Sequence, residues 1–194
     1  RGSNMLCLAD AIENYKIDAI IALVISNNDC DGIALAAARG LAIKVVKRSN
    51  FDNRLAHDAA IASSIEDCDA DYVFLAGYMA ILGSVFVDQF AGKLINIHPS
   101  LLPAFKGLDT HRRAIDAGVK THGASIHLVN GTLDDGPLIL QASLAVAETD
   151  TAEVLADRVL QLEHQIYPFV LLSLATQNVT LLHDGVIWQA TTLA

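Results

Sequence analysis

Two polar side chains at the end of an apolar run are placed where they could act together in catalysis. The run Leu94-Ile-Asn-Ile-His98 alternates apolar and polar residues, so a strand here places Asn96 and His98 on one face. Pro99 disfavours helical geometry at His98 and cannot donate to a sheet ladder, so the strand should end there. Ligands of open α/β sheets bind at such carboxyl ends. The pair therefore predicts a site, whereas a lone histidine bonded to a loop carbonyl is the structural alternative.

A second group that could take part in chemistry is a pair of carboxylates in the loop 129–138. Two glycines and a proline shape this loop, and Asp134 and Asp135 lie within it. Such pairs are usually solvated turn residues, but the flanking runs are apolar enough to be central strands. The loop would then reach the rim of the sheet near His98. A carboxylate beside a histidine favours the imidazolium form, which is the pairing that general acid–base chemistry needs.

The elements that must position these residues alternate between strand-sized apolar runs and helical patterns, which indicates βαβ units. We expect an α/β fold with a Rossmann-like open, mostly parallel twisted sheet flanked by helices. Strands are expected near 18–25, 42–46, 72–76, 94–97, 122–129 and 137–145. Helices are expected near 5–15, 32–39, 55–66, 84–91, 110–117 and 151–175, the last capped by Thr149 or Asp150. An Asp-Gly turn within 179–188 predicts a C-terminal hairpin.

The start of the chain has an unusual order of elements. It opens Arg1-Gly-Ser-Asn4 and continues at once into a helical pattern, although a strand normally feeds such a turn in a doubly wound fold. We therefore expect one domain over 1–194 whose first strand is missing from the printed sequence. Gly2 permits a tight turn, and Ser3 or Asn4 could cap the helix and leave backbone amides free for a phosphate. Most such turns are only helix caps.

Composition limits the classes of partner. The chain has 194 residues, 53% of them hydrophobic, and a formal net charge of −9, so it can bury one core and lacks the basic surface typical of nucleic-acid binding. Its apolar runs are too short or too charged to span a membrane, and no secretory signal is evident. We expect a soluble, cytoplasmic protein, a monomer or weak homodimer, that acts on small molecules. Cys7, Cys30 and Cys68 lack metal-ligand spacing and are predicted to be small core residues.

Three separated segments carry a resemblance to a known family. Asn96-Ile-His-Pro-Ser-Leu-Leu-Pro103, Gly107-Leu-Asp-Thr-His111 and Leu133-Asp-Asp-Gly-Pro137 occur in order and with similar spacing in the formyltransferases that use 10-formyltetrahydrofolate. The similarity runs from Gly2-Ser-Asn4 to Glu163-His-Gln-Ile-Tyr-Pro168 and covers nearly the whole chain. It implies formyl transfer from that folate to the amine of glycinamide ribonucleotide, a step of purine biosynthesis, with no metal.

The resemblance implies a catalytic triad of Asn96, His98 and Asp134. The amine would attack the formyl carbon and give a tetrahedral intermediate, whose oxygen Asn96 and a protonated His98 would stabilise. Asp134 would keep His98 charged and oriented and help to move the proton from the amine to the leaving folate nitrogen.

The resemblance also implies two sets of binding residues. The nucleotide-binding positions are Gly2, Ser3, Asn4, Leu160 and Glu163. The folate-binding positions are Arg54, Met79, Ala80, Ile81, Leu82, Val87, Asn96, Asn130, Gly131, Thr132, Leu133 and Asp134. Leu160 and Ala80 depart from the basic or amide residues of some relatives, which could weaken affinity. Without the resemblance, Glu163 would be assigned to a solvated helix face, and Met79, Ile81 and Leu82 to the core. His111 and His127 match family positions, where we expect structural or supporting roles.

Other functions share parts of this pattern. A hydrolase that removes formate from the same folate would use the same triad, and methionyl-tRNA formyltransferases share the core, but both kinds of relative carry an additional domain. A catalytically inert nucleotide-binding module is a further alternative, against which the intact triad argues. A metal site built from His98 and Asp134 would need a second histidine nearby.

Overall fold

The sheet that carries the predicted site is four-stranded. The computed structural model describes residues 2–189, and in it the strands are ordered β3 (Val73–Leu75), β4 (Leu94–His98), β5 (Thr121–Leu128) and β6 (Leu138–Ala145). β3 and β4 are parallel, whereas β5 is antiparallel to both β4 and β6. Three of the four strands therefore run in one direction. The α/β fold class is confirmed, although β6 forms the edge of this sheet and not a central strand.

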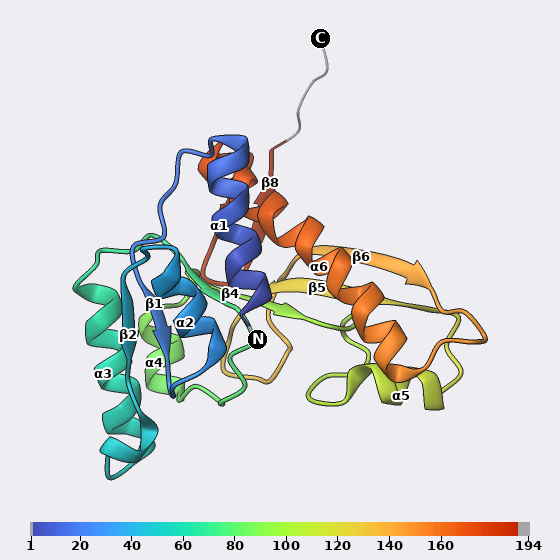
Figure 1. Cartoon of the computed structure of the whole chain (residues 1–194), viewed down its shortest axis with the longest axis horizontal. Helices are drawn as coiled ribbons and strands as arrows, with labels where there is room; N and C mark the ends of the chain where they lie inside the picture. Colours follow the sequence, from blue (N-terminus) through green and yellow to red (C-terminus); the bar gives the residue numbers. More distant parts are fainter. Residues whose placement is uncertain (1, 190–194) are drawn as a thin grey trace.

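A second, two-stranded sheet lies on the N-terminal side of the fold. Its parallel strands β1 (Val24–Ser26) and β2 (Ile43–Val45) are connected by α2 (Asp31–Ala38). The predicted strand 18–25 is too long, because β2 offers only three residues for pairing before the chain turns into the 3₁₀ helix η1 (Arg48–Asn50). Helices α3 (Arg54–Glu66) and α4 (Ser84–Gln89) lie near this sheet in Figure 1.

Two helices from opposite ends of the chain pack together beside the main sheet. These are α1 (Ser3–Tyr15) and α6 (Ala152–Ala175), which lie side by side in Figure 1, while α5 (Thr110–Asp116) lies against the start of α6. The C-terminal hairpin is confirmed as β7 (Val179–Leu181) and β8 (Val186–Trp188). Within residues 2–189, no helix is long and apolar enough to cross a membrane.

Apolar side chains between the main sheet and α6 form the larger core. Every third or fourth residue of α6 faces the sheet, as expected for a helix with one apolar stripe. The core includes Leu8, Ile95, Ile126, Leu128, Leu155, Val159, Tyr167 and Val170. A smaller core under α3 and α4 includes Val46, Ile61, Ile65, Phe86, Val87, Phe90 and Leu94. Burial of each large apolar side chain stabilises the fold by about 1.5–3 kcal/mol.

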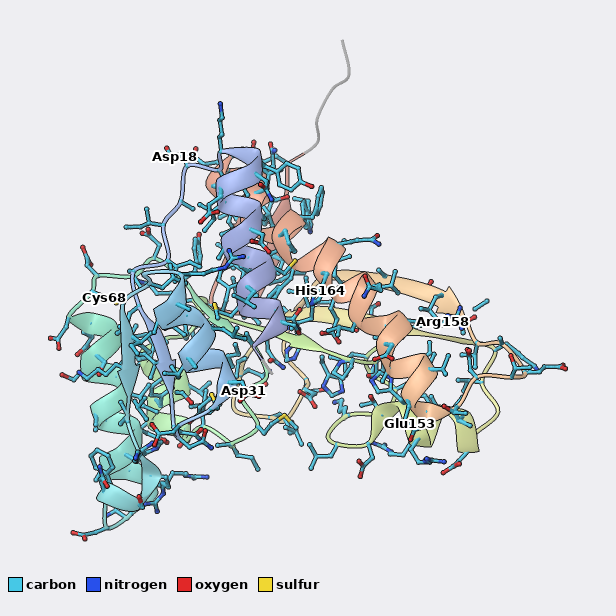
Figure 2. All side chains as sticks on the ribbon, in the orientation of Figure 1. Asp18, Asp31, Cys68, Glu153, Arg158 and His164 are labelled. Carbon is cyan, nitrogen blue, oxygen red and sulfur yellow. The ribbon has the colours of Figure 1, made fainter. Side chains whose placement is uncertain are left out.

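The cap of α6 differs from the prediction. Neither Thr149 nor Asp150 is the N-cap residue. That residue is Thr151, whose hydroxyl accepts the N–H of Val154 at 3.3 Å. The Asp150 carboxylate instead accepts the N–H of Ala147 and pairs with Arg158, which Figure 2 labels on α6. Thr149, Asp150 and Thr151 all have side chains that can cap a helix, so the sequence alone could not identify Thr151 as the N-cap.

The cysteines are not the core residues that we predicted. Cys30 is exposed, and Cys7 and Cys68 are only partly buried. Cys30 immediately precedes α2, where its Sγ lies 3.6 Å from the hydroxyl of Ser26. Cys30 is therefore exposed at a helix start, although cysteine usually prefers the protein interior.

A buried tyrosine on α6 connects the helix to two strands of the main sheet. The Tyr167 hydroxyl lies 3.1 Å from both the Leu75 and Ile95 carbonyl oxygens, so its single O–H is shared between β3 and β4. We predict that Tyr167→Phe lowers the free energy of unfolding by about 1–2 kcal/mol, because both carbonyls lose this donor in the interior. Urea unfolding measures the change. Tyr15→Phe, at a side chain that is 72% exposed, is the matched control and should leave stability unchanged. Equal stabilities of the two variants would contradict the prediction.

Candidate active site

Strand β4 presents Asn96 and His98 on one face, as predicted. Their apolar neighbours Ile95 and Ile97 are buried in the core on the other face. The antiparallel register pairs Asn96 with His127 and His98 with Ser125. The central strand β5 therefore brings a second histidine to the site.

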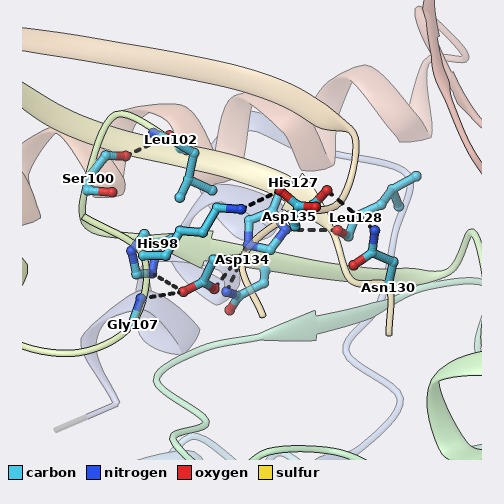
Figure 3. A network of polar contacts seen from close by, with 12 residues as sticks. His98, Ser100, Leu102, Gly107, His127, Leu128, Asn130, Asp134 and Asp135 are labelled. Atoms are coloured by element: carbon cyan, nitrogen blue, oxygen red, sulfur yellow. Dashed lines mark hydrogen bonds and ion pairs between the residues drawn. The ribbon is translucent and has the colours of Figure 1, made fainter. Parts of the chain in front are cut away.

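The imidazole of His98 lies between two acceptors. Its Nδ1 is 3.4 Å from Asp134 Oδ2, and its Nε2 donates to the Phe105 carbonyl oxygen at 3.0 Å. The Gly107 N–H donates to the same carboxylate oxygen of Asp134 at 2.8 Å (Figure 3). An acceptor at each ring nitrogen suits the imidazolium, in which both nitrogens carry a proton. The expectation that the 129–138 loop brings Asp134 to His98 is confirmed.

His127 orients the amide of Asn96. Its Nδ1–H donates to the Leu128 carbonyl oxygen at 2.8 Å, and its Nε2 accepts from Asn96 Nδ2 at 3.2 Å. Burial lowers the pKa of His127, which favours the neutral ring that this pattern needs, although Asp134 Oδ1 lies 3.6 Å from Nε2. The amide nitrogen of Asn96 has a second N–H that remains available for a ligand.

Two further histidines pack close to the site. The rings of His111 and His122 meet edge to face with centroids 5.4 Å apart, and the His122 ring also contacts Phe105. Burial, with a smaller effect of His111, lowers the pKa of His122 from 6.5 to about 4. Burial and the charge of His98 lower the pKa of His111. Both rings are therefore neutral at neutral pH.

The predicted nucleotide residues come together from distant parts of the chain. Asn4 Nδ2 donates to Glu163 Oε2 at 2.7 Å, although the two residues are 159 positions apart. Glu163 is 8% exposed, so the alternative of a solvated helix face is wrong, and its burial raises its pKa. The burial of Glu163 could have been predicted from the sequence, because Glu163 continues the apolar stripe of Leu155 and Val159 at intervals of four residues.

Within residues 2–189, no side chain caps the start of α1. Gly2 occupies the N-cap position with φ 78°, so the prediction that Ser3 or Asn4 caps this helix is wrong. A Cβ on Gly2 would lie 2.7 Å from the Gly32 Cα, which only glycine avoids. Because the N-cap residue has no polar side chain, the first amides of α1 are free to bind an anion.

The predicted folate residues that precede β4 lie on α3, in the 79–82 segment and on α4. Met79 and Ile81 are 72% and 67% exposed, so assigning them to the core would be wrong, whereas Leu82 and Val87 pack in the smaller core. A groove of about 460 Å³ between α3 and α4 is lined in part by Arg54 but by none of the residues 79–82.

The loop from Asn130 to Asp134 is held by its own polar groups. The Asn130 side chain accepts the N–H of Thr132 at 3.0 Å and donates to the Asp135 carbonyl oxygen at 3.3 Å. Leu133 points its apolar side chain toward solvent, since it is 57% exposed. The loop therefore offers an exposed apolar side chain next to the buried Asp134.

The sequence did not reveal the role of the loop after β4. The Phe105 carbonyl and the Gly107 amide bind the His98–Asp134 pair, and Lys106 pairs with Asp135. Phe105 and Asp109 have positive φ angles of 55° and 57°. Main-chain groups make the contacts to His98 and Asp134, so the side chains of this loop give no sign of them. Gly107 is the one residue whose type could have indicated an unusual backbone path here.

Comparison with known proteins assigns the chain to a family. The model of the formyl transferase family matches residues 1–171, and the chain belongs to that family. It is 40% identical to phosphoribosylglycinamide formyltransferase of Escherichia coli strain K12, over 96% of this chain and 88% of that protein. A solved phosphoribosylglycinamide formyltransferase from Coxiella burnetii superposes with a TM-score of 0.92 at 38% identity, over 97% of this chain and 89% of that one. A formyltetrahydrofolate deformylase from Pseudomonas syringae is also similar, with a TM-score of 0.87 at 26% identity, over 98% of this chain and 63% of that one.

The alternative of a metal site would use His98, Asp134 and a second histidine. Among residues 2–189, no group of three or more histidine, cysteine, aspartate or glutamate side chains is arranged to hold a metal ion. The second histidine that such a site would need is His127, whose Nε2 already accepts from Asn96.

The depressed pKa of His122 predicts a dependence of stability on pH. Between the unfolded value of 6.5 and the folded value of about 4, the unfolded chain takes up a proton that the folded chain does not. His122 should therefore reduce the free energy of unfolding by up to about 3 kcal/mol as the pH falls through this window. His122→Asn should remove that part of the loss, as measured by urea unfolding at about pH 7.5 and about pH 4.5. The exposed His183, changed to Asn, is the control. If both variants lose as much stability on acidification as the unmodified protein, the prediction is wrong.

Proposed function

We propose that this protein transfers the formyl group of 10-formyltetrahydrofolate to the amine of glycinamide ribonucleotide. The observation that carries the proposal is the cluster of Asn96, His98 and Asp134 in a chain of the formyl transferase family. Asp134 lies 3.4 Å from His98, and His127 contacts both Asn96 and Asp134. The relatives from Escherichia coli and Coxiella burnetii, both named for this activity, are matched over nearly their full length.

The proposed reaction proceeds by addition and elimination at the formyl carbon. The nucleotide amine attacks that carbon, a C–N bond forms, and the carbonyl oxygen becomes negatively charged. Asn96 donates an amide N–H to this oxygen and His98 supplies positive charge beside it. Each such contribution is worth about 3–4 kcal/mol in the transition state. The bond from carbon to the folate nitrogen then breaks as a proton moves from the attacking amine to that nitrogen, with Asp134 as its carrier, directly or through water.

The two substrates would bind through different residues near β4. Glycinamide ribonucleotide would place its phosphate at the first amides of α1, where Gly2, Ser3 and Asn4 lie. Glu163 would accept polar groups of the nucleotide, with Leu160 one turn away. The folate would contact Arg54, the 79–82 segment with Val87, and the loop from Asn130 to Asp134. We further propose one catalytic domain over residues 1–194 that works in the cytoplasm as a monomer or weak homodimer.

A formyltetrahydrofolate hydrolase is the second candidate. The deformylase from Pseudomonas syringae favours it, since that fold is similar, but the chain spans only 63% of the deformylase. Absorbance assays of folate deformylation with and without glycinamide ribonucleotide distinguish the two functions. Deformylation that requires the nucleotide supports the transferase. Deformylation without the nucleotide identifies a hydrolase, and no reaction in either assay would leave an inert binding module.

The proposed roles predict the effect of two substitutions in the triad. His98→Ala and Asp134→Asn should lower kcat by about a hundredfold or more, because proton transfer and charge stabilisation are both impaired. Steady-state formyl transfer measures this loss, with circular dichroism to confirm folding.

Asp135→Asn is the matched control for Asp134→Asn. Asp135 is the next residue and carries the same charge, but its half-exposed side chain pairs with Lys106 on the surface. Its kcat should stay within about threefold of the unmodified protein, as expected for an exposed ion pair. Activity close to that of the unmodified protein in either triad variant would refute the assigned roles.

A further inference from the structure

The side chain of Arg113 binds the loop that follows β4. Its Nη1 donates to the Lys106 carbonyl oxygen at 2.6 Å and to the Leu108 carbonyl oxygen at 3.1 Å. Its guanidinium carbon also lies 5.6 Å from the centre of the Phe105 ring. One side chain of α5 therefore contacts three residues of this short segment.

The peptide group between Lys106 and Gly107 connects Arg113 to the proposed catalytic pair. Its carbonyl oxygen accepts from Arg113, and its N–H donates to Asp134 Oδ2 at 2.8 Å. A trans peptide is planar, and its oxygen and hydrogen point in opposite directions. Arg113 and Asp134 thus hold the same rigid group from opposite sides, and fixing its oxygen also fixes the direction of its N–H.

The positive charge of Arg113 also favours the hydrogen bond from the Gly107 N–H to Asp134. A cation at the carbonyl oxygen polarises the peptide and strengthens the N–H as a donor to the carboxylate. The neighbouring Phe105 carbonyl, on the preceding peptide, accepts from His98 Nε2. Phe105 and Asp109 hold positive φ angles, which are unfavourable for residues with a Cβ and persist only where surrounding contacts hold them.

We propose that Arg113 is a positioning residue for formyl transfer. It fixes the Lys106–Gly107 peptide, which in turn holds Asp134 against His98. Arg113 acts through the loop and not by direct contact with the reacting atoms. This inference rests on the proposed function for its kinetic test, but the orientation of Asp134 is measurable without any activity.

Arg112 provides a matched control on the same helix. It carries the same charge one residue earlier, but its Nη2 lies 3.4 Å from Glu153 Oε1 at the start of α6, where Figure 2 labels Glu153. The pair is exposed, so its loss should have little effect. Arg112→Ala therefore removes one positive charge from α5 and leaves the loop after β4 intact.

The kinetic test compares Arg113→Ala with Arg112→Ala in the full chain. Arg113→Ala should lower kcat by about tenfold to a hundredfold, the loss expected when a charge-assisted hydrogen bond no longer orients a catalytic group. The KM for glycinamide ribonucleotide should change by less than about twofold, because Arg113 does not reach the start of α1. Arg112→Ala should retain both constants. Unchanged kcat in Arg113→Ala overturns the proposal.

The structural test follows the Gly107 amide by NMR in the uniformly ¹⁵N-labelled chain. Asp134→Asn gives the reference for a weakened bond to the carboxylate. The Gly107 amide proton in Arg113→Ala should shift toward this reference and exchange faster with solvent, whereas Arg112→Ala should leave it unchanged. A fall in kcat without a change at this amide overturns the proposal, because the effect would then travel by another route.

A second variant covers the case in which Arg113→Ala does not fold. Arg113→Gln keeps a donor for the Lys106 carbonyl but loses the charge, so its kcat and its Gly107 amide signal should lie between those of the unmodified protein and of Asp134→Asn. Values equal to those of the unmodified protein would overturn the proposal. If the unmodified protein transfers no formyl group, the proposed function fails, and the NMR comparison still decides whether Arg113 orients Asp134.

Discussion

The buried carboxylate of Asp134 is the interaction on which the arrangement of the site depends. The residue is 9% exposed and adopts a positive φ angle of 48°, two features that cost free energy unless neighbouring groups compensate. Compensation comes from the Gly107 amide at 2.8 Å and from His98 at 3.4 Å. These partners come from the loop after β4 and from β4 itself, while the carboxylate belongs to the loop that follows β5. The site is therefore complete only when these separate parts of the chain have folded together.

The path of the 129–138 loop is what brings this carboxylate inward. The Leu128 N–H donates to the Pro137 carbonyl oxygen at 2.9 Å, which closes the loop at its base. A Cβ on Gly136 would lie 1.8 Å from the Leu128 carbonyl oxygen, so only glycine permits this approach. The same Leu128 carbonyl accepts the Nδ1–H of His127. Closing the loop and fixing the tautomer of His127 thus depend on the same stretch of backbone.

Local periodicity predicted the parts of the fold that depend on local preferences. Alternation from Leu94 to His98 gave β4 and the shared face of its two polar residues, and the apolar spacing after Thr151 gave α6. The prediction was weaker where contacts between distant segments decide the structure. The bond between Asn4 and Glu163 and the short pairing of β1 are of this kind. Contacts made by main-chain groups, such as the Phe105 carbonyl, carry no residue signature at all.

The beginnings of three helices differ in whether a side chain bonds to their first backbone amides, which bears on the phosphate site proposed for this chain with a net charge of −9. In α3 and α6 the side chains of Asn53 and Thr151 accept a backbone N–H of the first turn. In α1 the N-cap is Gly2, and no acidic residue lies in the first turn. Its amides and the positive end of its dipole therefore face the proposed phosphate without competition from a cap. Near this helix start, the Glu163 carboxylate accepts a hydrogen bond from Asn4 Nδ2 at 2.7 Å, and its burial raises its pKa.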